Sequence, residues 1–181
     1  EEVDELGGRV LSESMRVPEV GRMAVVSDPQ GGIFSLFAPE GSEDDEAPTG
    51  RSGTITWREI MCDSPRDVWE FYRELFGWEQ TDTMNMGNDG VYLMYGRDGE
   101  TWGGIGPKPK EMGEAPAFWV FYISVDDLDE AVERARNHGG TVMNEPMEVP
   151  GGDRVAHCLD PQGAMFALHE FGSDSSTPQM G

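Results

Sequence analysis

Lysine is almost missing from this chain of 181 residues, which has only Lys108 and Lys110 against 35 acidic residues. The formal net charge of −22 repels phosphate backbones and anionic lipid. We therefore expect neither nucleic acid nor a membrane as a partner. So acidic a surface is typical of proteins that work in concentrated salt, as in halophiles, where screening suppresses self-repulsion.

Cysteine is also scarce, and the two that occur, Cys62 and Cys158, have no CxxC spacing. The sequence therefore predicts two buried thiols and indicates neither a disulfide framework nor a zinc site. The chain has no run of 18 apolar residues, and its first residues, EEVDELGG, lack the basic and apolar regions of a signal peptide. These absences predict a cytoplasmic protein.

An internal repeat is the strongest positive feature. Residues 7–37 align with residues 139–169 at a constant offset of 132, and 15 of the 31 aligned positions are identical, including the four letters DPQG. A repeat of this length implies two copies of one structural unit. Each DPQG is typical of a tight turn, in which Asp160, for example, bonds backbone amides and Gly163 adopts a positive φ.

The pattern between the repeats predicts two successive β-α-β-β-β modules, over residues 54–110 and 116–171. In the first, TITWREIMC indicates a strand and DSPRDVWEFYRELFG a helix with Asp63 or Ser64 as its N-cap. Three strand-like pieces follow, separated by turn residues. The second module repeats this order, with TVMNEPMEVP expected as one strand.

Residues 1–38 read as the end of a helix and the three closing strands of one further, partial module. The acidic segment 39–53, rich in Gly, Pro and Ser, has the composition of a linker, and residues 172–181 that of a frayed tail. Three strands alone leave an apolar face uncovered. We therefore expect Val26, Ile33 and Phe34 to be buried, and predict a homodimer with this partial module at or near its interface.

A family resemblance rests on the two-module arrangement and on the segments FYRELFGW and DPQGAMFALHEF. By these features the chain resembles the vicinal oxygen chelate superfamily, which has the glyoxalase and bleomycin-resistance fold. The resemblance covers residues 54–171 as a full domain and 1–38 as a partial one. It implies an α+β fold in which paired βαβββ modules form a U-shaped half-barrel with a ligand groove on the concave face. Relatives include lyases, isomerases, dioxygenases and drug-sequestering proteins, so the fold alone does not give the activity.

Members of the superfamily usually hold a divalent metal on the first and last strands of each module. Here these positions carry Trp57, Val120, Ala167 and the pair Gly103 and Gly104, none of which is a side-chain donor for a metal. We therefore expect no metal at this place and no cofactor.

Strand alternation predicts which residues share the groove, because residues two apart point to one face. The expected lining is apolar and aromatic, with a few polar groups. Its predicted ligand-binding residues are Trp57, Met61, Trp102, Phe118 and Met165, and its predicted catalytic residues are Glu59, Tyr122 and His169, with His157 as a further polar candidate.

Three functions fit this groove. The first is metal-free binding of a small organic ligand. The second is a lyase- or isomerase-type reaction with Glu59 as general base and Tyr122 or His169 as acid, assisted by a metal on His157 and His169 if one binds. The third is a remnant of a tandem gene that merely folds, with Glu59 held by a hydrogen bond from Tyr122 or Trp102.

Overall fold

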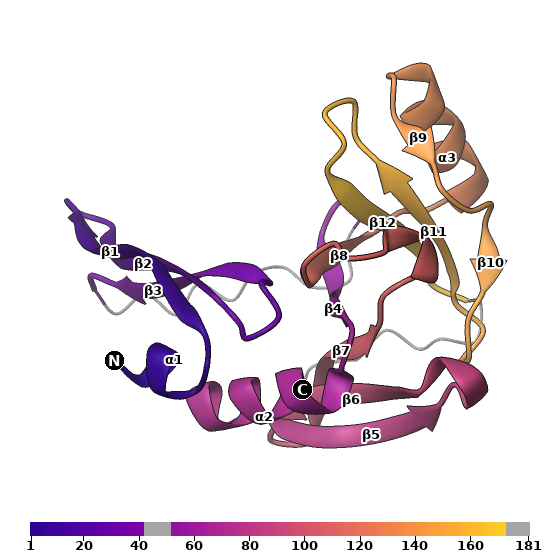
Figure 1. The fold of residues 1–181 in the computed structure, drawn as a ribbon. Helices are drawn as coiled ribbons and strands as arrows, with labels where there is room; N and C mark the ends of the chain where they lie inside the picture. The colour runs from indigo at the N-terminus through magenta and orange to yellow at the C-terminus, as the bar shows by residue number, and fades with distance from the viewer. Residues whose placement is uncertain (42–51, 173–181) are drawn as a thin grey trace. The chain divides into compact units, whose positions relative to one another are not determined.

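The computed structural model describes residues 1–41 and 52–172, which form two compact units. Most of the predicted linker 39–53 and tail 172–181 lies outside the described residues. Unit 1 contains residues 1–41 and 59–119, and unit 2 contains residues 52–58 and 120–172. Strand β4 (Ile55–Cys62) therefore contributes its first half to unit 2 and its second half to unit 1 (Figure 1).

Unit 1 begins with the predicted helix end and three strands. These are α1 (Glu2–Glu5), β1 (Arg9–Val17), β2 (Gly21–Ser27) and β3 (Ile33–Pro39). The strands form an antiparallel sheet in the order β1-β2-β3, called the N-terminal sheet below. The rest of unit 1 is the first predicted β-α-β-β-β module, in which the strands lie in the order β4-β7-β6-β5. Its further elements are α2 (Pro65–Phe76), β5 (Glu79–Asn85), η1 (Gly87–Asp89), β6 (Val91–Arg97), β7 (Glu100–Pro107) and η2 (Lys110–Met112).

Helix α2 begins and ends at the predicted residues. Ser64 has an extended backbone as N-cap, Pro65 is the first helical residue, and Gly77 ends the helix in the left-handed conformation with φ of 64°. Proline suits the first turn because a backbone N–H at this position would have no acceptor within the helix. Glycine suits the end because it adopts a positive φ without strain. The left-handed residue Gly77 thus ends the helix and lets the chain change direction before β5 begins at Glu79.

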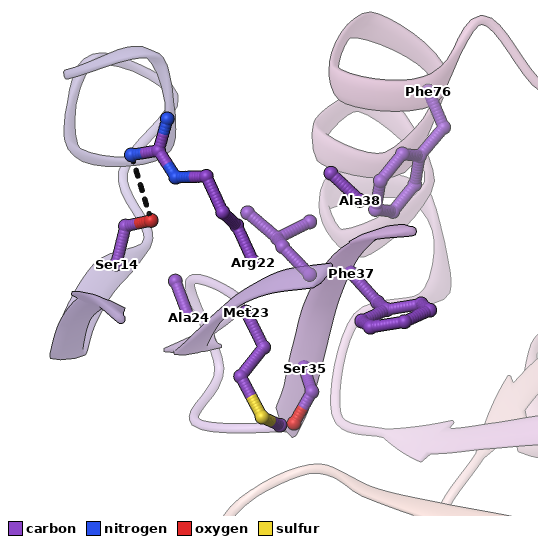
Figure 2. A pocket seen from close by; sticks show the side chains of 9 residues that line it. Ser14, Arg22, Met23, Ala24, Ser35, Phe37, Ala38 and Phe76 are labelled. Carbon is purple, nitrogen blue, oxygen red and sulfur yellow. Dashed lines mark hydrogen bonds between the residues drawn. The ribbon is translucent and has the colours of Figure 1, made fainter. Parts of the chain in front are cut away.

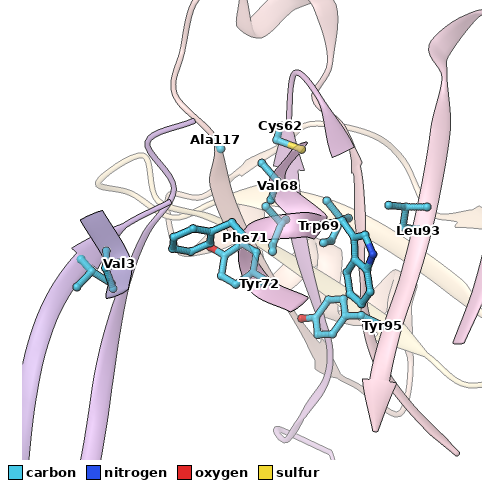
Figure 3. Close-up of a cluster of buried hydrophobic side chains, with 12 residues drawn as sticks. Val3, Cys62, Val68, Trp69, Phe71, Tyr72, Leu93, Tyr95 and Ala117 are labelled. Atoms are coloured by element: carbon cyan, nitrogen blue, oxygen red, sulfur yellow. The ribbon is translucent and has the colours of Figure 1, made fainter. Parts of the chain in front are cut away.

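Helix α2 lies at the centre of the core of unit 1, to which it contributes Val68, Trp69, Phe71 and Tyr72 (Figure 3). Phe34 of the N-terminal sheet packs on Tyr72 with ring centroids 5.4 Å apart, while Tyr72 stacks on Trp78 at 5.2 Å. The N-terminal sheet is therefore covered on one face by a helix of its own chain. Val26 is buried as predicted, but Ile33 is 59% exposed, because only the other face of its strand meets α2.

The first DPQG turn joins the N-terminal sheet to the start of α2. Gln30 Oε1 accepts hydrogen bonds from the backbone N–H groups of Asp63 (2.8 Å) and Ser64 (3.0 Å), and its Nε2 donates to the Ser64 carbonyl at 2.9 Å. In the second copy Gln162 is exposed. The predicted turn is confirmed in both copies, and the first copy has this additional docking role.

Unit 2 is the second β-α-β-β-β module. Its elements are β8 (Phe118–Ser124, the first two residues in unit 1), α3 (Leu128–Asn137), β9 (Thr141–Val142), β10 (Met147–Glu148), β11 (Arg154–Leu159) and β12 (Met165–Glu170). The strand order is β10-β11-β12-β8-β4, with β9 also paired to β11, and β12 runs parallel to β8. The predicted α+β class and the succession of two βαβββ modules are confirmed.

One predicted strand is wrong in extent. TVMNEPMEVP was expected to be continuous and instead forms the two short strands β9 and β10. Pro146 lies in the gap and has no N–H to give to a ladder. The aligned residue of the repeat is Ser14, and there the strand β1 runs unbroken over nine residues.

Both cysteines are free and buried, as predicted. Burial raises the pKa of the Cys62 thiol to about 12, so this thiol is an inert part of the core. Neither α2 nor α3, nor any shorter helix in the described ranges, has the length and apolar content needed to cross a bilayer.

Candidate functional site

A row of three paired residues crosses the sheet of unit 2. Ala167 of β12 lies opposite Tyr122 of β8 on one side and opposite His157 of β11 on the other. Paired residues point to the same face of a sheet. Because the alanine side chain is a single methyl, the Tyr122 ring reaches across it, and the Tyr122 hydroxyl lies 2.9 Å from His157 Nε2.

Asn144 fixes the tautomer of His157. Its Oδ1 accepts the backbone N–H of His157 at 3.0 Å, so this atom must be the amide oxygen. The same oxygen lies 2.8 Å from His157 Nδ1, which therefore carries the proton. Nε2 is left as the acceptor of the Tyr122 O–H. Burial lowers the pKa of His157 below its ordinary 6.5, so the ring is neutral at pH 7.

Asn144 can serve in this way because the strand is broken beside it. It lies between β9 and β10, two residues before Pro146, where the chain leaves the ladder. In the first copy of the repeat Ser12 occupies the aligned position on a continuous strand, opposite Val25. The Tyr122–His157–Asn144 chain is therefore specific to the second copy.

A second polar chain surrounds His169, which is 9% exposed. Its Nδ1 lies 2.7 Å from the Thr56 hydroxyl, and its Nε2 lies 3.0 Å from Asp153 Oδ2. The other oxygen of Asp153 accepts the backbone N–H of Gly172 at 2.9 Å. Both nitrogens of the His169 ring thus have protein partners.

The three predicted catalytic residues fall into separate places. Tyr122 and His169 belong to unit 2 but to two different polar chains, and Glu59 belongs to unit 1, where it is 4% exposed. The partner of Tyr122 is His157, which the sequence offered only as a further polar candidate. The sequence missed Thr56, Asn144 and Asp153, and only the proline beside Asn144 could have pointed to one of them.

The predicted ligand-binding residues are all partly buried. Trp57 and Met165 belong to unit 2, whereas Met61, Trp102 and Phe118 belong to unit 1. The indole N–H of Trp102 donates to Glu100 Oε2 at 3.4 Å. The suggested hydrogen bond to Glu59 and the ligand contacts of the five residues stay predictions.

The donor set of unit 2 does not fit a divalent metal. His157 and His169 have both ring nitrogens in hydrogen bonds, and each would have to give one up to bind an ion. Within residues 1–41 and 52–172 no group of three or more His, Cys, Asp or Glu side chains is arranged to hold a metal. In this arrangement the two histidines take part in hydrogen bonds, along which a proton can be transferred.

Comparison with known protein families shows that residues 53–168 match the glyoxalase/bleomycin resistance protein/dioxygenase superfamily. Among curated relatives, the anthracycline biosynthesis protein DauV of Streptomyces sp. (strain C5) is 36% identical over 93% of this chain. The anthracycline biosynthesis protein DnrV of Streptomyces peucetius is 34% identical over the same share. The chain spans about 60% of the length of each of these relatives.

Among solved structures, the Mn(II)-bound glyoxalase from Novosphingobium aromaticivorans matches with a TM-score of 0.59 and 18% identity. The match covers 93% of this chain and 56% of that one. At this identity the likeness concerns the fold alone.

Proposed function

Since the chain belongs to the glyoxalase/bleomycin resistance protein/dioxygenase superfamily, we propose that it binds a small organic molecule without a metal, at the face of unit 2 that carries Tyr122 and His157. The observation that carries this proposal is the Tyr122–His157–Asn144 chain. It holds a neutral imidazole and a phenol side by side in fixed orientations, which is how a mostly apolar site selects a polar group.

The pair suits a ligand that has both a hydroxyl and a carbonyl group. The Tyr122 oxygen can accept a ligand O–H while its own proton stays on the bond to His157. If the Tyr122 hydroxyl instead rotates to a ligand carbonyl, His157 Nε2 is free to accept a ligand O–H. Two relatives are named for anthracycline biosynthesis, which supports polycyclic hydroxyketones as the ligand class.

We expect metal-stripped protein to bind 1,8-dihydroxyanthraquinone as well as untreated protein does. Tyr122→Phe should weaken binding about three- to tenfold, because one hydrogen bond is lost. Tyr95→Phe is the matched control, since Tyr95 stacks on Trp78 in the core of unit 1. Binding is measured by fluorescence titration, with metal content determined on the same samples.

The pH dependence gives an independent reading of the same site. The folded-state pKa of His157 lies below 6.5, so its neutral form and the contacts that need it are kept at pH 7 and lost as pH falls through that lowered value. Loss of affinity on metal removal, or equal effects of Tyr122→Phe and Tyr95→Phe, would contradict the proposal.

Proton-transfer chemistry is the second candidate, because Glu59 is a carboxyl that is only 4% exposed. A general base there would exchange carbon-bound hydrogens of a ketone ligand with solvent. The test incubates the protein in deuterated buffer with 1-tetralone, a ketone that has exchangeable hydrogens beside its carbonyl, and measures deuterium uptake by mass spectrometry. Deuterium uptake that Glu59→Gln abolishes while binding persists would favour this candidate over simple binding.

A further inference from the structure

A groove of about 400 Å³ lies at the N-terminal sheet, entirely within unit 1 and apart from Tyr122 and His157 (Figure 2). Its apolar walls include Leu36 of β3 and Phe76 of α2. Its polar groups include the Arg22 guanidinium and the Ser14 hydroxyl, which form a hydrogen bond with each other. This volume falls within the usual range of small-molecule sites, which are mostly apolar with a few polar groups.

Arg22 is one of several arginines of this acidic chain without a carboxylate partner among the described residues. Its guanidinium donates to Ser14 Oγ at 3.1 Å, and within the described residues it makes no ion pair with a carboxylate. Arg16, on the neighbouring strand, pairs with Glu40. The groove therefore presents a positive group whose hydrogen-bonding capacity is only partly used.

The second copy of the internal repeat has an arginine at the position of Arg22, and there the guanidinium is paired with carboxylates. Arg22 aligns with Arg154, which forms ion pairs at 3.0 Å with Asp129 and with Glu170. Glu170 aligns with Ala38, which lines the groove. The first copy thus keeps the arginine but has a methyl group where the second copy has a carboxylate.

We propose that this groove is a second ligand site, for a small amphiphilic carboxylate. The ligand carboxylate pairs with Arg22 in the place that Glu170 takes in the repeat, and the apolar part of the ligand lies against Leu36 and Phe76. Guanidinium and carboxylate match in geometry as well as in charge, which favours a carboxylate over a neutral group of the same shape.

The test compares 2-naphthoate with 2-naphthamide, which has the same shape without the charge, by isothermal titration calorimetry. We expect the wild-type chain to bind the acid about fivefold more tightly than the amide, as for an ion pair at a solvent-accessible site. Amide resonances of residues 22–38 should shift with the acid in two-dimensional NMR spectra. Tyr122→Phe should leave this preference unchanged, which separates this site from the one proposed above.

Two variants decide the role of Arg22. Arg22→Gln should reduce the affinity for the acid to that for the amide, whereas Arg9→Gln, which removes the same charge from β1 outside the groove, should not. Ala38→Glu restores the carboxylate of the repeat, so it should pair with Arg22 and abolish the preference while the chain stays folded by circular dichroism. A preference that survives Arg22→Gln, or no preference in the wild-type chain, overturns the proposal.

Discussion

Asp28 shows how the same residue can have two environments in a repeated sequence. Its Oδ1 accepts the backbone N–H groups of Gln30 at 2.8 Å and Gly32 at 2.9 Å, and its Oδ2 accepts the Tyr72 hydroxyl at 3.1 Å. Asp160 keeps the two backbone bonds in the second copy, at 2.8 and 2.9 Å. The turn is thus encoded by the motif itself, whereas the burial of Asp28 at 2% exposure comes from α2.

Asp28→Asn should change the pH dependence of stability in a defined direction. Burial raises the pKa of Asp28 above its ordinary 3.8, against the effect of its hydrogen bonds. The stability that this gives is full below pH 3.8 and is lost as pH rises through the folded-state value. Asparagine stays neutral, can accept the two backbone bonds through Oδ1, and can donate to Tyr72 through Nδ2.

The melting temperature of Asp28→Asn relative to wild type should therefore rise between pH 3.5 and pH 7, from just below the ordinary carboxyl pKa to about three units above it. Asp160→Asn is the matched control, because it changes the same turn without the contact to Tyr72. A flat difference for Asp28→Asn across this range would show that the buried carboxyl is not the cause.

At the level of elements, the glutamine of the DPQG turn stabilises tertiary structure only in the first copy, where it hydrogen-bonds the backbone at the start of α2. Gln30 satisfies two backbone N–H groups and one carbonyl at the junction of β4 and α2. Gln30→Ala should lower the free energy of unfolding by about 1–3 kcal/mol, because these groups lose their partner. Urea denaturation measures the change.

Gln162→Ala makes the identical substitution in the second copy, where the side chain is exposed, and we expect an effect within about 0.5 kcal/mol there. The comparison removes any effect of the turn sequence itself. Equal losses in the two variants would mean that the turn, and not the docking of Gln30, sets the stability.

The sequence predicted the helices and most strands because their signals are local. The residues that begin and end α2, namely Ser64, Pro65 and Gly77, all lie within or next to the helix in the sequence. The internal repeat predicted the first three strands by analogy with the last three. Asn144 could not be predicted as the partner of His157. That contact depends on how far Pro146 displaces the chain from the ladder, which is a tertiary effect that no local pattern encodes.

Across the whole molecule, the N-terminal sheet has one face packed on α2 and large apolar side chains on the other. Met15, Ile33 and Phe37 are 54%, 59% and 54% exposed, and the register places Met15 and Phe37 on either side of Met23. Three large apolar residues on one sheet face are a feature of protein contact surfaces. We therefore still propose a homodimer, in which this face of one copy covers the same face of another around a two-fold axis.

The net charge of −22 on each copy opposes this association at low ionic strength. The screening length falls from about 30 Å at 0.01 M salt to about 3 Å at 1 M, while burial of apolar surface does not weaken with salt. The dimer fraction should therefore rise with salt concentration. Light scattering should give a mass near the 20.0 kDa of one chain in dilute buffer and about twice that in 1 M salt.

Met15→Lys combined with Ile33→Lys should keep the chain monomeric in both buffers, because two charges would be buried without partners in the contact. Met147→Lys is the control, since Met147 is 50% exposed on the two-residue strand β10 of the other unit. If the wild-type mass stays at that of one chain in high salt at micromolar concentration, the dimer proposal is wrong, and the apolar face of the N-terminal sheet stays exposed in a monomer. If Met147→Lys also dissociates the dimer, the contact lies on a different face.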